Sequence, residues 1–244
     1  MNLDRVTITG ADDSIAPADL IPLTRQYPFV EWGILFSGSR QGTPRYPSGT
    51  WLGALGDYAF KEKLDLSAHL CGWWVRDLVL HGDLTFKDEY NSLWPIFQRL
   101  QLNFHGQFHK AVLGFRQQIA LCRDKEFILQ HDGVNDATIL TLGAELPVVP
   151  LFDRSGGAGI VPADWPKPIW KYQGYAGGLG PENIEEELRR IADAAGESRI
   201  WIDMETKVRS ADDLKFDLEK VETCLRLAAP FVKPQTTDSR RSDA

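Results

Sequence analysis

Eight short apolar runs rich in β-formers recur along the chain, and most are followed by a longer segment with helical spacing. The runs cover residues 6–9, 29–36, 64–70, 100–104, 127–131, 148–152, 169–172 and 200–204. Strands that alternate with helices are typical of βα units, in which the strands pair in parallel. This alternation restricts the chain to an α/β architecture built around a parallel sheet.

The helical segments cover residues 17–26, 50–61, 74–80, 108–120, 136–142, 182–194 and 216–227. The link 156–167 contains Gly and Pro and indicates a loop in place of a helix. Eight βα units in 244 residues match the size of a (β/α)8 TIM barrel. A doubly wound sheet is the alternative, but it usually binds its ligand at one switch point, whereas polar residues here follow nearly every strand.

We therefore expect one α/β domain, a single (β/α)8 TIM barrel over residues 1–234 with a degenerate sixth helix. Residues 235–244 are polar and are expected to form a disordered tail. The sequence leaves both a monomer and a homodimer open.

The charge and cysteine content exclude several classes of function. The chain has 27 basic and 34 acidic residues, a net charge of -7, and no basic block longer than Arg240-Arg241, which argues against nucleic-acid and membrane partners. Three widely spaced cysteines form no Cys-x-x-Cys pair, so neither a disulfide framework nor a zinc site is expected. With no long apolar span, a cytoplasmic location fits best.

Polar residues stand at the ends of the expected strands, where TIM barrels place their active sites. No dinucleotide fingerprint or metal-ligand spacing accompanies them, so neither a cofactor nor a metal is expected. The candidates are Thr9, Asp12, Asp13, Ser37, Arg40, Arg45, His69, Cys71, Asn103, His105, His131, Asp132, Asp153, Lys171, Gln173, Asp203, Glu205 and Lys207.

A glycine-rich stretch, Tyr175-Ala176-Gly177-Gly178-Leu179-Gly180-Pro181-Glu182-Asn183, runs from the seventh strand into a helix start. Backbone N–H groups at such a start can bind a phosphate, and barrels commonly bind phosphate after strands seven and eight. The same glycines could instead form a tight turn without a ligand.

Four segments resemble phosphoribosylanthranilate isomerase, the TIM-barrel enzyme of tryptophan biosynthesis. They are Val6-Thr7-Ile8-Thr9-Gly10, Thr43-Pro44-Arg45-Tyr46-Pro47-Ser48, residues 151–165, and Gly177-Gly178-Leu179-Gly180-Pro181-Glu182-Asn183. Their order and spacing span nearly the whole chain.

The resemblance implies an Amadori rearrangement of a phosphorylated aminoribose. An acid opens the sugar ring and a base removes the C2 proton. By position, Asp153 matches the general acid, Arg45 the group that orients the reacting atoms, and Gly177 and Gly178 the phosphate cradle. Gly156 and Gly157 would let the loop after Asp153 close over the small phosphorylated substrate. Asp203 and Lys207, at the end of the eighth strand, are further candidates for binding it.

The chain departs from that family at two positions. Thr9 stands where the family has its catalytic cysteine, and a hydroxyl is too weak an acid to replace the thiol unaided. After strand eight, Met204-Glu205-Thr206-Lys207 replaces a small Ser-Gly turn; Glu205 would repel a phosphate, whereas Lys207 would attract it.

Several interpretations of these departures stay open. Another group could be the base, with Asp12, Asp13, His69, Cys71 and His131 as candidates. Alternatively the substrate has changed, or the barrel has lost catalysis and acts as a binding protein. A lyase or aldolase that forms a Schiff base at Lys171 is a further alternative.

Overall fold

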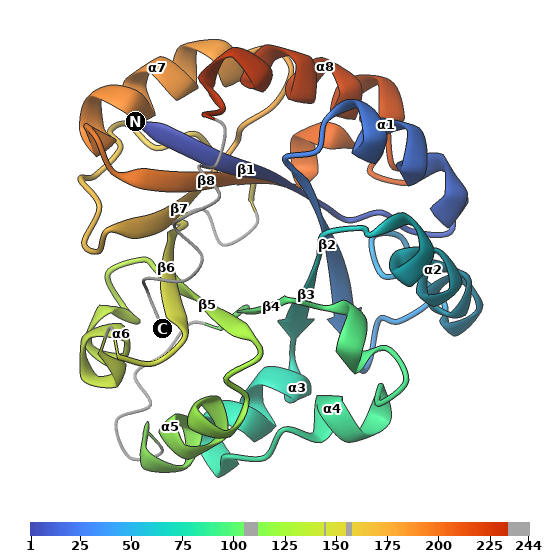
Figure 1. Ribbon diagram of the computed structural model, residues 1–244, viewed down its shortest axis with the longest axis vertical. Helices are drawn as coiled ribbons and strands as arrows, with labels where there is room; N and C mark the ends of the chain where they lie inside the picture. Colours follow the sequence, from blue (N-terminus) through green and yellow to red (C-terminus); the bar gives the residue numbers. More distant parts are fainter. Residues whose placement is uncertain (105–111, 144, 155–157, 234–244) are drawn as a thin grey trace.

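Eight parallel strands close into a barrel in chain order, and helices surround it (Figure 1). The computed structural model describes residues 1–104, 112–143, 145–154 and 158–233. The architecture confirms the expected single (β/α)8 TIM barrel. The strands are β1 (Asn2–Thr9), β2 (Val30–Ser37), β3 (Leu66–Cys71), β4 (Arg99–Leu102), β5 (Glu126–His131), β6 (Val148–Phe152), β7 (Tyr172–Ala176) and β8 (Arg199–Met204).

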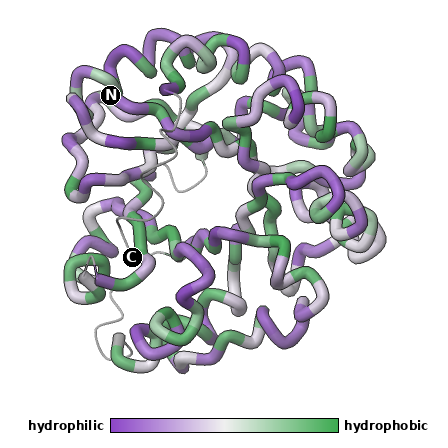
Figure 2. Tube along the Cα trace, viewed as in Figure 1, coloured by the Kyte–Doolittle hydropathy of each residue, from purple (hydrophilic) through white to green (hydrophobic). Residues whose placement is uncertain are grey.

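The outer layer consists of helices of unequal length that carry both hydrophobic and hydrophilic residues (Figure 2). Residues 158–171, between β6 and β7, contain no helix, as expected for a degenerate unit. None of the described helices is long and apolar enough to cross a membrane. The α-helices are α1 (Leu20–Gln26), α2 (Gly49–Glu62), α3 (Trp73–Arg76), α4 (Thr85–Glu89), α5 (Val112–Leu121), α6 (Asp136–Leu142), α7 (Ile184–Ala195) and α8 (Leu218–Ala228).

Side-chain caps fix where two of the helices begin. The Ser48 hydroxyl accepts a hydrogen bond from the backbone N–H of Trp51 at the start of α2, and Asp217 accepts one from Lys220 at the start of α8. Each cap satisfies a backbone donor that has no partner within the helix. These starts position the loops that precede them, which form the rim of the barrel.

The seventh strand begins later than its sequence pattern predicts. The expected strand covered residues 169–172, but β7 runs from Tyr172 to Ala176 and contains Gly174. A Cβ on Gly174 would lie 2.4 Å from Cε2 of Trp201 on the neighbouring strand, so the packing requires glycine there. Glycine is depleted in strands, and the true strand therefore has the weaker pattern.

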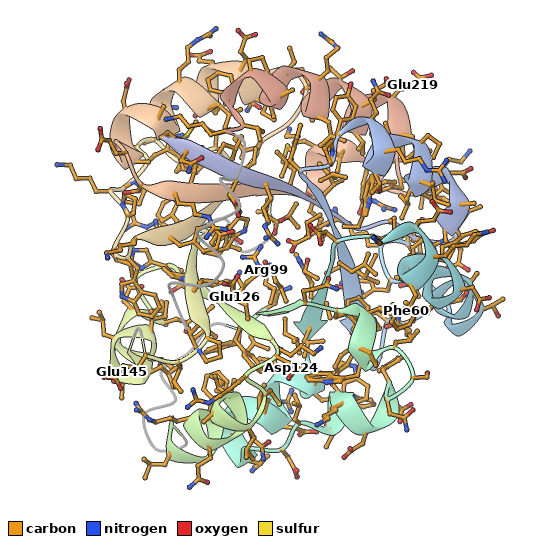
Figure 3. All side chains as sticks on the ribbon, viewed as in Figure 1. Phe60, Arg99, Asp124, Glu126, Glu145 and Glu219 are labelled. Atoms are coloured by element: carbon orange, nitrogen blue, oxygen red, sulfur yellow. The ribbon has the colours of Figure 1, made fainter. Side chains whose placement is uncertain are left out.

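The lower barrel interior is filled by an ion network under an apolar layer. Arg99 bonds Glu31 at 3.0 Å and Glu126 at 2.7 Å, and the charges of Arg99 and Arg5 lower the pKa of buried Glu31 to about 2 despite desolvation. Figure 3 shows Arg99 and Glu126 within the ring of strands. Trp201 packs above Arg99, whose guanidinium lies 4.2 Å from its ring centroid. The interior below the rim is therefore a packed core rather than a channel.

Candidate functional site

A cavity of about 370 Å³ opens at the carboxyl ends of the strands. Odd-numbered residues of β3, β4 and β6 and even-numbered residues of β5 point inward there, because successive side chains of a strand alternate between its two faces. The lining is polar and combines acids, amides and cations. It includes Arg40, Arg45, Tyr46, Cys71, Gln101, Asn103, Gln130, Asp153, Gly177, Gly178, Asp203, Glu205 and Lys207.

Asp203, the penultimate residue of β8, is a buried acid at the floor of this cavity. Its Oδ1 accepts a 2.8 Å hydrogen bond from the Thr9 hydroxyl. Burial is the main cause that raises the pKa of Asp203 to about 8, and the charges of Glu205 and Asp153 act in the same direction. The Thr9 bond opposes the rise. At neutral pH Asp203 is mainly protonated, which is the state that a proton donor needs.

Asp153 lies in the same cavity, directly after β6. It is 7% exposed, and its Oδ2 accepts a 3.2 Å hydrogen bond from the Gln130 amide on β5. Asp153 and Asp203 thus come from two different strands and meet at one polar cavity. Two carboxyl groups of which one is held protonated can act as an acid and base pair.

The cations of the cavity differ in what they bind. The Arg45 guanidinium bonds Glu205, and its Nε lies 2.7 Å from Asp213. Lys207 is exposed and makes no hydrogen bond or ion pair with the described part of the chain. Lys207 is therefore better placed than Arg45 to attract an anionic ligand.

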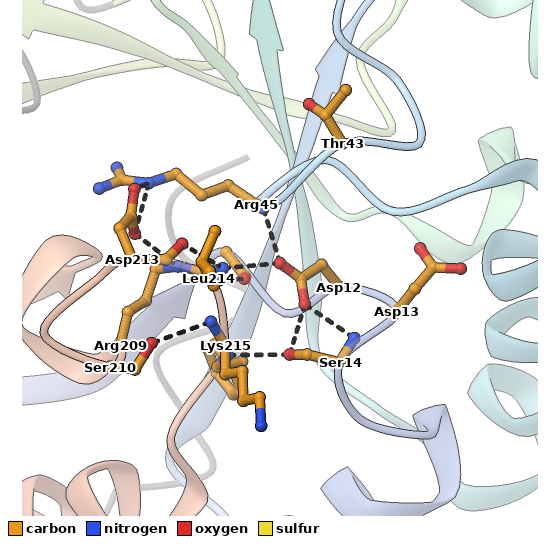
Figure 4. Close-up of polar contacts among 12 residues, drawn as sticks. Asp12, Asp13, Ser14, Thr43, Arg45, Arg209, Ser210, Asp213, Leu214 and Lys215 are labelled. Carbon is orange, nitrogen blue, oxygen red and sulfur yellow. Dashed lines mark hydrogen bonds and ion pairs between the residues drawn. The ribbon is translucent and has the colours of Figure 1, made fainter.

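The loops after β1, β2 and β8 are tied together at the rim (Figure 4). Fully buried Arg209 bonds Asp12 at 2.7 Å and Asp213 at 2.8 Å, and Asp12 also accepts the backbone N–H of Arg45 at 2.6 Å. Arg45 and Asp213 both have positive φ, 75° and 61°, a strained conformation for residues with side chains. The network fixes Arg45 beside the cavity and uses Asp12 as a structural acid.

Gly177 and Gly178 line the cavity and also allow a close backbone approach. A Cβ on Gly178 would lie 2.5 Å from the backbone N of Val161, in the loop after β6, and the φ of Gly178 is +60°. The tight-turn interpretation explains these glycines without a ligand, while their place in the lining leaves a phosphate role as a prediction. Gly156 and Gly157 lie outside the described residues.

Of the other candidate bases, Cys71 lines the cavity, where burial raises the pKa of its thiol, whereas His69, His131 and Asp13 lie outside it. His69 is buried below it, with Nε2 3.0 Å from the Ser67 hydroxyl, and burial lowers its pKa to about 3, so it is neutral. His131 points outward and its Nδ1 lies 2.6 Å from Asp136 on α6. Asp13 accepts hydrogen bonds from Ser48 at the start of α2. These contacts are structural.

Lys171 does not fit the Schiff-base interpretation. It is exposed and precedes β7, at the amino end of the strand and away from the cavity. The misplaced seventh strand is the reason that the sequence suggested otherwise. His105 lies outside the described residues.

Sequence reasoning missed Gln101 and Gln130, which both line the cavity. Arg99, Gln101 and Asn103 alternate with apolar residues, and this period of two indicates one polar and one apolar face. In a barrel the polar face of such a strand can point inward at the rim. Among the residues described, no group of three or more His, Cys, Asp or Glu side chains could hold a metal ion.

Comparisons with known proteins support the fold. No family model and no curated protein matches the chain. A truncated 3-deoxy-D-arabino-heptulosonate 7-phosphate synthase from Thermotoga maritima is 11% identical with a TM-score of 0.54 and covers 95% of this chain and 89% of its own. A D-psicose 3-epimerase from Clostridium cellulolyticum is 8% identical with a TM-score of 0.52, and the match covers 93% of this chain and 98% of the epimerase.

A phosphoribosyl anthranilate isomerase from Thermococcus kodakaraensis is also similar, at 16% identity, over 93% of this chain and 99% of its own. Its TM-score is 0.48, too low to distinguish this enzyme from other barrels. The chain therefore has the fold of TIM-barrel enzymes, and identities this low do not assign a reaction.

Proposed function

We propose that this protein is a small-molecule enzyme that moves protons on a phosphorylated, sugar-type metabolite, in an isomerisation of the kind that the sequence resemblance implies. The observation that carries the proposal is the meeting of Asp153 and Asp203 in one polar cavity, with Asp203 held protonated by burial. A carboxyl group with a pKa near neutrality is suited to general acid–base catalysis.

The two carboxyl groups have complementary roles in this proposal. The Asp153 carboxylate takes a proton from the carbon next to a carbonyl or imine, and the Asp203 carboxyl group donates its proton to the oxygen or nitrogen of that group. Asp153 then returns its proton to the neighbouring carbon of the resulting enediol or enolamine, and Asp203 takes back a proton from the hydroxyl group on the carbon that was deprotonated, which becomes the new carbonyl. The resemblance gives Asp153 the donor role instead, but the raised pKa of Asp203 favours Asp203 as the first donor.

Two contacts argue that the substrate differs from that of the resembled family. Thr9 uses its hydroxyl proton to bond Asp203, so it is a positioning group rather than a base. The Arg45 guanidinium is engaged by Glu205 and Asp213, and is not free to orient a reacting group. These contacts also keep the binding-protein interpretation as the second candidate.

The first experiment measures turnover of phosphoribosylanthranilate by the loss of its fluorescence. A second assay follows exchange of carbon-bound protons of ribose 5-phosphate with D2O by NMR, which detects proton transfer without knowledge of the natural substrate. Both are run on the native protein, Asp153→Asn, Asp203→Asn and, as a matched control, Asp57→Asn, which changes an exposed residue of α2.

We expect turnover or exchange in the native protein and in Asp57→Asn, with a loss of about 10²- to 10⁴-fold in each cavity variant. Activity that survives in both cavity variants would exclude the carboxyl pair as the catalytic groups. Binding of ribose 5-phosphate without turnover or exchange in the native protein would favour a barrel that binds its ligand and has lost catalysis.

A further inference from the structure

The amide of Gln101 has a buried polar atom without a partner. Gln101 is 5% exposed and lines the cavity from β4. Its Nε2 donates a 3.0 Å hydrogen bond to Oδ1 of Asn103, but its Oε1 has no hydrogen-bond partner among the described residues. A buried polar group left unpaired costs free energy, so such an atom in a binding cavity points to a ligand.

Reversing the amides does not remove the unpaired atom. Asn103 also contacts the Cys71 sulfur, with Nδ2 3.3 Å from Sγ, and a thiol can either donate or accept a weak hydrogen bond. If both amides are flipped, Asn103 donates to Oε1 of Gln101, and Nε2 of Gln101 loses its partner instead. In either orientation one polar atom of Gln101 remains for a ligand.

The chemistry of that ligand group follows from its surroundings. A hydroxyl group can both donate and accept, so it satisfies Gln101 in either orientation, whereas a phosphate oxygen can only accept. The carboxylate of Asp153 repels an anion from the inner part of the cavity, while exposed Lys207 attracts one at the rim.

We infer that Gln101 is a specificity-determining residue that binds a hydroxyl group of the substrate. The substrate is then a polyol or sugar phosphate, with its hydroxyl-bearing end at the floor and its anionic end near Lys207. This orientation rests on the proposed function, which it refines by naming the end of the substrate that enters first. Gln101 contributes recognition, and the proton transfers belong to the two carboxyl groups.

Isothermal titration calorimetry with three probes tests the inference: ribitol 5-phosphate, n-pentyl phosphate of the same chain length without hydroxyls, and inorganic phosphate. The proteins are the native form, Gln101→Leu, and the matched control Gln117→Leu on the exposed face of α5. Gln101→Met, which is unbranched, serves as a second variant if Gln101→Leu does not fold.

We expect the native protein and Gln117→Leu to bind ribitol 5-phosphate at least about tenfold more tightly than pentyl phosphate. Loss of one buried hydrogen bond should reduce that preference about tenfold in Gln101→Leu, with affinity for inorganic phosphate unchanged. Its melting temperature should stay the same or rise, because the substitution removes an unpaired buried atom.

An unchanged preference in the Gln101 variants, or no preference in the native protein, would overturn the inference. Its failure is separable from that of the proposed function. A preference that falls in Gln101→Leu without any turnover in the native protein supports the hydroxyl site and contradicts catalysis. Turnover together with an unchanged preference does the reverse.

Discussion

The Thr9 hydroxyl donates a 2.8 Å hydrogen bond to Asp203, across the pairing of β1 with β8. At the position where the resembled family has its catalytic cysteine, this chain therefore has a donor that stabilises the charged form of a buried acid. The bond places the Asp203 carboxyl group and limits how far burial can raise its pKa.

Thr9→Val should raise the pKa of Asp203 further above about 8, because it removes the hydrogen bond that favours the ionised carboxylate. Carbon-13 NMR titration of aspartate carboxyl groups measures the midpoint directly. Thr9→Ser keeps the hydroxyl and should titrate as the native protein does. A midpoint that is the same in Thr9→Val and the native protein would refute the assigned role of this bond.

Asp203→Asn should stabilise the protein at pH 8 but hardly at pH 4. The folded pKa of about 8 lies above the unfolded value of about 3.9. Between these values the folded state holds a proton that the unfolded state lacks, so the free energy of unfolding falls as pH rises. We expect a gain on the order of a few kcal/mol at pH 8 by urea denaturation. Equal gains at the two pH values, or a similar gain in Asp57→Asn, would contradict the shift.

Gly33→Ala should destabilise the protein by about 1–3 kcal/mol, the usual cost of overpacking. A Cβ there would lie 2.2 Å from Oγ1 of Thr9 and 2.8 Å from Nε2 of His69. Gly53→Ala is the matched control, because a Cβ on this residue of α2 meets nothing within 4 Å and should stabilise the helix by about 0.5–1 kcal/mol. Chemical denaturation measures the free energy of unfolding of both variants. Effects of the same sign would show that the packing around Gly33 is looser than these distances indicate.

Arg209→Gln should cost about 3–5 kcal/mol of unfolding free energy, because it breaks a buried ion pair and leaves Asp12 without its cation. The comparison is Arg189→Gln, which removes an exposed pair with Glu185 from a side chain that is 63% exposed. Such pairs contribute about 0.3–0.5 kcal/mol. If the two variants lose similar amounts, the rim network does not hold its loops together.

The misplaced range of β7 shows what sequence patterns can and cannot predict about the fold. The range of β6 was predicted correctly from its apolar run, and so was α6. β7 was misplaced because Gly174 interrupts its β pattern, and that glycine is required by the inward-facing Trp201 of a neighbouring strand. Contacts between strands far apart in the sequence leave no local signal.

The candidate site was predictable to the extent that strand ends could be located. Asp153 and Asp203 were expected at strand ends because their strands end in clear apolar runs, and both line the cavity there. His131 ends an equally clear strand but points outward, since one residue of register decides the face. The raised pKa of Asp203 depends on burial and on charges from other loops, which the sequence does not reveal.

The packed interior beneath the cavity has a kinetic consequence. Ile128, Leu151 and Trp201 are fully buried there, above the ion network of Arg99 and Glu31. A ligand therefore enters and leaves through the same opening at the strand ends. Product that has not yet departed blocks the next substrate molecule, so a reaction in this cavity is subject to competitive product inhibition, and its rate depends on how quickly the cell removes the product.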